Sequence, residues 1–217
     1  RHGWQEPPAD AYPTGGDLVD AYLRPLAETP ELAAVIETGA RIGAIGRQGI
    51  DKVATKGREA RPFVLSVTGP AGHARRDLAA AVIDAPGTWT TPNPLGAGGL
   101  PAEGEDTLAG RITYGLPDVL GRDLATFSGR TTLVVGAGHS AANVLLGLGR
   151  LADRDPATTL IWVTRSTNLM RVYGGGSDDK LAARGELGAE LKALVERGRV
   201  ALVTGFAITS VREAGGR

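Results

Sequence analysis

Hydrophobic positions in the second half of the chain alternate between strand-like runs and helical stripes. Continuous apolar runs lie at 131–135, 160–163 and 200–203. Such runs are typical of strands buried on both faces. Apolar residues recur at the helical period over 140–151 and 187–195, and Gly198 stands where a helix commonly ends. Strand, helix, strand, helix, strand predicts an α/β fold with a parallel sheet and right-handed crossovers.

The first half has shorter patterns. Apolar residues follow the helical period over 17–26, where Thr14 or Asp17 could cap a helix. Strand-like runs lie at 40–45, 63–68 and 78–83, with a further one at 207–211 near the end of the chain. The turn-forming residues 69–72 predict that the second and third of these runs form a β-hairpin.

A long connection rich in glycine and proline covers residues 86–107. Connections of this length are usually functional or lie between domains. We therefore predict one domain over 1–107, including the connection, and a second over 108–217. The chain begins with Arg1 and its one methionine is Met170, so we expect a fragment of a longer protein.

Composition excludes several functions. The 24 basic and 24 acidic residues balance, which argues against a dedicated nucleic-acid binder. No stretch reaches the roughly 18 to 20 apolar residues of a membrane span, and no signal peptide is visible, so we expect a cytoplasmic protein. Cysteine is absent, which excludes disulfides, thiolate metal sites and catalytic cysteines. His2, His73 and His139 lack metal-ligand spacing, so we expect no metal.

The motif with chemical content is G-x-G-x-x-A, formed by Gly136, Gly138 and Ala141 between the first predicted strand and its helix. Gly136 permits a tight turn, Gly138 lets the backbone approach a pyrophosphate, and Ala141 allows close packing of the helix. The free N–H groups of the helix then face the phosphates. The alternative is a tight turn that binds nothing.

The end of the second strand favours NADP over NAD. An NAD site usually places a carboxylate there for the ribose, but this strand is followed by Arg165, a cation suited to a 2′-phosphate. Arg171 could assist. In the other interpretation Arg165 is a solvated surface charge.

Two polar residues lie inside the glycine motif. We expect Ser140 to donate a hydrogen bond to phosphate or to cap the helix. His139 has no carboxylate partner visible in the sequence, so we favour a role in positioning over acid–base catalysis.

The stretch Ala81–Trp89, followed by the glycine motif, resembles the second signature of two-dinucleotide flavoproteins. The chain is similar to flavin-containing monooxygenases and pyridine nucleotide-disulfide reductases over most of residues 12–206, and most specifically over 82–145. It lacks their first G-x-G-x-x-G, Pro86 replaces their signature threonine, and the reductases' cysteine pair is absent.

The resemblance implies a Rossmann-type NAD(P)H-binding domain over 108–217 and part of an FAD-type domain with a β-hairpin over 1–107. It implies FAD in the complete protein and contacts to it from Gly87 and Thr88. We expect Trp89 and Trp162 to pack in a core or between domains rather than on flavin. The loop Tyr173–Asp179 either lines the adenosine or flavin side or is a flexible turn whose aspartates cap the next helix.

The preferred function is therefore an FAD-dependent oxidoreductase. It would take hydride from NADPH and pass electrons through flavin to oxygen or another acceptor, as in a monooxygenase, with catalytic residues and the small-molecule substrate unidentified. The alternatives are a noncatalytic NADP-binding sensor, a nicotinamide-only dehydrogenase and a scaffold. A homodimer is compatible with the sequence; nucleic-acid and membrane partners are not expected.

Overall fold

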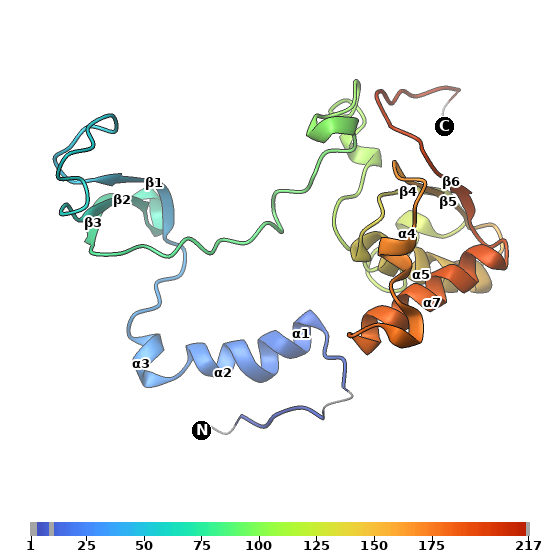
Figure 1. Cartoon of the computed structure of the whole chain (residues 1–217), viewed down its shortest axis with the longest axis horizontal. Helices are drawn as coiled ribbons and strands as arrows, with labels where there is room; N and C mark the ends of the chain where they lie inside the picture. Colours follow the sequence, from blue (N-terminus) through green and yellow to red (C-terminus); the bar gives the residue numbers. More distant parts are fainter. Residues whose placement is uncertain (1–3, 9–10, 216–217) are drawn as a thin grey trace. The chain divides into compact units, whose positions relative to one another are not determined.

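The computed structural model describes residues 4–8 and 11–215. It divides into two compact units, Arg1–Pro86 and Gly87–Arg217. The chain is of the α/β class, with one antiparallel and one parallel sheet of three strands each (Figure 1).

The first unit opens with a capped helix. Thr14 Oγ1 accepts from the N–H of Asp17 at 3.1 Å, and the Asp17 carboxylate accepts from the N–H of Thr14 at 2.8 Å, which completes a capping box. The helical segments are α1 (Gly15–Leu18), a π-helical turn (Val19–Leu23), α2 (Arg24–Ala27) and α3 (Pro30–Ala33). Pro25 follows the π turn and has no N–H to donate to the turn before it.

The antiparallel sheet has the order β1 (Arg41–Arg47), β2 (Phe63–Thr68), β3 (Ala74–Ala79). The predicted β-hairpin is confirmed, but its second strand begins earlier than the sequence indicates. The turn closes when the N–H of Gly69 donates to the carbonyl of His73 at 2.8 Å, so Thr68 pairs with Ala74. Because Phe63 already pairs with Ala79, the apolar residues 80–83 have no partner left on β2.

The parallel sheet of the second unit has the order β4 (Thr131–Val135), β5 (Thr159–Val163), β6 (Ala201–Val203). Its long helices are α5 (His139–Arg154) and α7 (Ala182–Glu196). The shorter elements are α4 (Leu124–Phe127), α6 (Met170–Tyr173) and 3₁₀ turns at Ala97–Gly99, Ala109–Arg111 and Gly176–Asp178, with another at Pro70–Gly72 in the first unit. The predicted parallel α/β arrangement is confirmed.

Both long helices cover the same face of this sheet (Figure 1). Strands that follow one another in sequence and in space, joined by right-handed crossovers, place their helices on one side. The helices approach closely at Gly149, where a Cβ would lie 2.7 Å from Leu194 Cδ1. The opposite face is only partly covered: Leu133 is 49% exposed, so the expectation of strands buried on both faces is wrong for β4.

The connection of residues 87–107 packs within the second unit. The N–H of Ala97 donates to Ile208 at 2.9 Å, and Glu103 exchanges backbone hydrogen bonds with Thr209 and Val211 at 2.9 and 2.8 Å. These bonds explain why the units divide at Pro86, whereas the sequence pattern predicts a first domain of 1–107 that includes the connection. No helix in the described part of the chain is both long and apolar enough to cross a bilayer.

Candidate functional site

The glycine turn directly follows the end of β4. Gly136 has φ +127°, a conformation that favours glycine, and its N–H donates to the carbonyl of Val163 at 3.0 Å. Gly138 caps α5, and nothing lies within 4 Å of the position its Cβ would take. Ala141 comes within 3.9 Å of such a Cβ on Gly136. The contact at Gly136 is an ordinary van der Waals distance, and the open position at Gly138 leaves room for a ligand to approach the backbone.

The first turn of α5 leaves its amides free. The first helical bond runs from the N–H of Ala142 to the carbonyl of Gly138 at 3.1 Å. Among the described residues, the N–H groups of 137–141 have no acceptor, and Gly138 has no side chain to cap them. Together with the positive end of the helix dipole, these donors can hold an anion.

His139 and Ser140 are the first two residues of α5, and both are exposed. Ser140 does not cap the helix, because the cap position belongs to Gly138. A hydroxyl at the second helical position stays available to a ligand. No acidic side chain in the described part of the chain pairs with His139, which leaves it without the partner that an acid–base role would normally have.

Arg165 follows β5 at the same edge of the sheet as the glycine turn, since Val135 and Val163 are paired. It is exposed and forms no ion pair with a described residue. Its flanks are held by hydrogen bonds: Thr164 Oγ1 donates to the carbonyl of Ser166 at 2.7 Å, and Ser166 Oγ to that of Asn168 at 3.0 Å. The structure thus places the glycine turn and Arg165, which has no ion-pair partner among the described residues, at the carboxyl ends of two adjacent strands.

Trp162 is the residue of this region whose contribution the sequence did not reveal. Its predicted place in the core is confirmed, since it is 0% exposed. Its indole N–H also donates to the carbonyl of Gly136 at 2.7 Å, and its ring packs edge-on against Tyr173 with centroids 6.3 Å apart. In the sequence, the one sign of this hydrogen bond is a tryptophan near the end of β5, the strand next to β4.

The second glycine-rich loop is ordered by a buried carboxylate. The Asp179 side chain is 1% exposed, forms a two-pronged ion pair with Arg184 at 2.7 and 2.8 Å, and accepts from the N–H groups of Gly175 and Leu181. The Arg184 guanidinium, followed by these two amides, holds the pKa of Asp179 far below its usual range. The aspartate therefore fixes the loop and is not a side-chain cap on α7.

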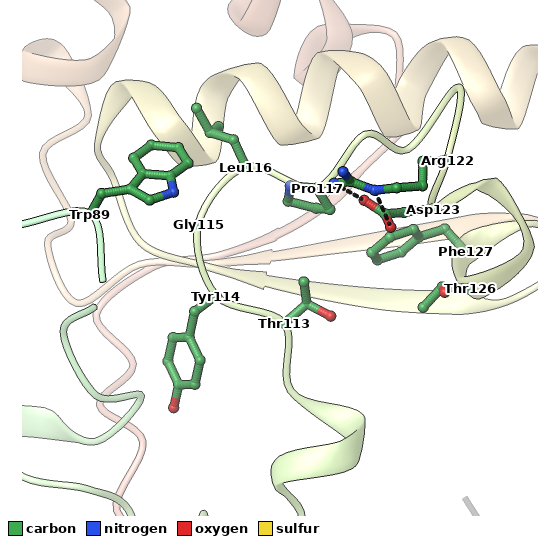
Figure 2. A pocket seen from close by; sticks show the side chains of 10 residues that line it. All are labelled: Trp89, Thr113, Tyr114, Gly115, Leu116, Pro117, Arg122, Asp123, Thr126 and Phe127. Atoms are coloured by element: carbon green, nitrogen blue, oxygen red, sulfur yellow. Dashed lines mark hydrogen bonds and ion pairs between the residues drawn. The ribbon is translucent and has the colours of Figure 1, made fainter. Parts of the chain in front are cut away.

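A shallow pocket of about 370 Å³ lies elsewhere in the second unit (Figure 2). Figure 2 shows Trp89 and Leu116 at one end and the Arg122–Asp123 ion pair with Phe127 at the other. Trp89 is 76% exposed and so does not pack in a core, while packing between domains stays a prediction for it. The pocket is open and shares no lining residue with the glycine turn.

Glu105 anchors the wall of this pocket and was also missed. It is 7% exposed and accepts from the N–H groups of Leu95 at 2.9 Å and Ala102 at 2.6 Å and from the Tyr114 hydroxyl. The tyrosine hydrogen bond is the main cause that lowers the pKa of Glu105. Burial, with a further contribution from the carboxylate, raises the pKa of Tyr114.

Gly87 and Thr88 are not brought to the glycine turn by any hydrogen bond among the described residues. Both are exposed, Gly87 has φ +68°, and its Cβ position is open.

Within the described residues, no group of three or more histidine or acidic side chains could hold a metal ion. Comparison with family models, curated proteins and solved structures found no match to this chain.

Proposed function

We propose that the second unit is the Rossmann-type, NADPH-binding part of a flavin-dependent oxidoreductase. The observation that carries this proposal is the turn between β4 and α5, where Gly136 has a positive φ and the N–H groups of 137–141 have no acceptor among the described residues. Two adjacent phosphates are the ligand that such a turn suits best, because they accept several hydrogen bonds and carry the charge that the helix dipole stabilises.

The choice of NADPH rests on Arg165. A dinucleotide whose pyrophosphate lies on α5 directs its adenosine ribose toward the end of the neighbouring strand. There the sequence Val163-Thr164-Arg165-Ser166 has no carboxylate, and the exposed guanidinium of Arg165 forms no ion pair with a described residue. A guanidinium binds a 2′-phosphate through charge-assisted hydrogen bonds, and a carboxylate would repel it.

FAD is included in the proposal because the order of the stretch Ala81–Trp89 and the glycine motif resembles that of two-dinucleotide flavoproteins. The open Cβ position and positive φ of Gly87 are compatible with close approach of a cofactor there. When both cofactors are bound, NADPH supplies a hydride and FAD passes the electrons on to oxygen or another acceptor. The chain's own contribution is to bind the nucleotide and hold it in place.

A calorimetric titration of the chain with NADPH and with NADH tests this proposal. We expect NADPH to bind about tenfold to a hundredfold more tightly, as hydrogen bonds to a charged group allow. Arg165→Ala should abolish the preference without changing NADH affinity. The matched control is Arg130→Ala, because Arg130 is exposed, lies just before β4 at the opposite edge of the sheet and forms no ion pair with a described residue.

Equal loss in both variants would refute the role of Arg165, and absence of binding in the unmodified chain would refute the nucleotide site. NADPH oxidation by the complete protein in the presence of FAD, followed by absorbance, separates the candidate functions, because the resemblance implies FAD in the complete protein. Binding without any FAD-dependent oxidation would favour a noncatalytic NADP-binding module.

A further inference from the structure

The indole of Trp162 occupies an unusual position between sheet and glycine turn. It lies on the face of β5 that α5 and α7 cover, paired with Val134 in the sheet register, and is fully buried. A buried indole N–H must find an acceptor, and here the acceptor is the carbonyl of Gly136 at 2.7 Å.

This bond sets the direction of the next amide. In a planar trans peptide the C=O and the following N–H point to opposite sides. The carbonyl of Gly136 is turned inward to Trp162, so the N–H of Ala137 points away from the core. That N–H is the first of the five amides without an acceptor among the described residues.

Both polar groups of Gly136 are bonded to β5. Its N–H donates to Val163 and its C=O accepts from Trp162. Glycine has more conformational freedom than any other residue, so a turn built on it needs such external restraints to keep one conformation. Among the described residues, no other side chain forms a hydrogen bond with Gly136, Ala137 or Gly138.

Packing against Tyr173 restrains the indole of Trp162. The Tyr173 ring packs against it with an interplanar angle of 71°. The backbone of Tyr173 in turn lies so close to α7 that a Cβ on Gly188 would come within 1.8 Å of its carbonyl oxygen. Trp162 therefore has little room to rotate away from the turn.

We propose that Trp162 is a positioning residue for the dinucleotide, which acts through the carbonyl of Gly136 and directs the N–H of Ala137, the first of the amides of 137–141, toward the pyrophosphate. This inference rests on the proposed function. Because Trp162 is fully buried, it does not touch the ligand. Its effect falls on the pyrophosphate, which NADPH and NADH share, and leaves the preference set by Arg165 unchanged.

The test compares Trp162→Phe, which removes the donor and keeps an aromatic ring, with Leu160→Val in the full chain. Leu160 is buried on the same strand and the same face, so its truncation weakens the core without touching Gly136. The first readout is amide hydrogen exchange of Gly136 without nucleotide, because its N–H is bonded to Val163, whereas the N–H groups of 137–141 have no acceptor among the described residues. Loss of one buried hydrogen bond should speed exchange there by about tenfold in Trp162→Phe and leave it unchanged in Leu160→Val.

The second readout is the dissociation constant for each nucleotide. We expect Trp162→Phe to weaken NADPH and NADH by the same factor, about tenfold, and Leu160→Val to weaken neither. A loss confined to NADPH would overturn the proposal, as would equal exchange at the turn in both variants. If exchange at the turn is faster in Trp162→Phe but the unmodified chain binds neither nucleotide, the proposed function is refuted. The role of Trp162 in dinucleotide binding is then refuted as well.

A measurement on the unmodified sequence covers the case in which Trp162→Phe does not fold. In the ¹⁵N-labelled chain, the indole N–H signal of Trp162 should exchange slowly with water and shift on saturation with NADPH. The signals of Trp4 and Trp89, which are exposed, serve as internal controls. A Trp162 signal that exchanges as fast as theirs, or does not move at saturation, would overturn the proposal.

Discussion

Replacement of Gly188 by alanine should destabilise the second unit, although alanine is the better helix former. Gly188 lies inside α7, where glycine is about 1 kcal/mol less favourable than alanine. A Cβ at this position would lie 1.8 Å from the carbonyl oxygen of Tyr173 and 2.4 Å from its carbonyl carbon. Both atoms belong to the backbone, so rotation of a side chain cannot relieve the contact.

The magnitude follows from the distance. An ordinary contact between carbon and carbonyl oxygen is about 3.3 Å, so helix and loop must separate by about 1.5 Å. Overpacking of a folded core costs about 1 to 3 kcal/mol, and a backbone shift of this size belongs at the upper end. After the gain in helix propensity, we expect Gly188→Ala to lose about 2 kcal/mol.

Urea denaturation followed by tryptophan fluorescence measures this loss, since Trp89 and Trp162 report on the second unit. With an m-value of about 2 kcal/mol/M, the midpoint should fall by about 1 M. The control is Gly147→Ala in α5, where the Cβ would meet only a methyl group of Val119, at 2.7 Å. A midpoint for Gly188→Ala equal to or above that of Gly147→Ala would refute the reasoning.

Two further predictions concern the buried carboxylates. An unperturbed aspartate has a pKa of about 3.9, and Arg184 holds that of Asp179 lower when folded. The ion pair of Asp179 therefore stabilises the folded state above the unfolded pKa, and this stability is lost as the pH falls toward the pKa of the folded state. Asp179→Asn should be less stable at neutral pH, and its stability should fall less as the pH is lowered. Thermal unfolding between about pH 2 and 6 measures both effects. Glu105→Gln should lower the pKa of Tyr114, because the carboxylate that raises it loses its charge, and an unchanged ultraviolet titration would contradict this.

The sequence predicted those parts of the fold that depend on local periodicity. The runs at 131–135 and 160–163 became β4 and β5, and the 140–151 stripe became α5. Gly198 also ends α7 as expected, with φ +67°, because the signal lies within one turn of the helix. These features need no knowledge of distant contacts.

The features that the sequence did not reveal depend on residues far apart along the chain. Trp162 meets Gly136 only after β5 has paired with β4. The burial of Glu105 depends on a connection that folds against residues 208–211, about a hundred positions later. Gly185 and Gly188 look like weak points of a helix, and only the approach of the loop from residue 173 to 176 explains them.

The double attachment of Gly136 to β5 also bears on the entropy of binding. Fixing the backbone of one residue costs about 1 to 2 kcal/mol, so ordering the three residues 136–138 from a floppy loop would cost on the order of 3 to 6 kcal/mol. Here that loss occurs when the protein folds. An anion that binds at the turn meets donors already in place, which corresponds to an advantage of about two to four orders of magnitude in its dissociation constant.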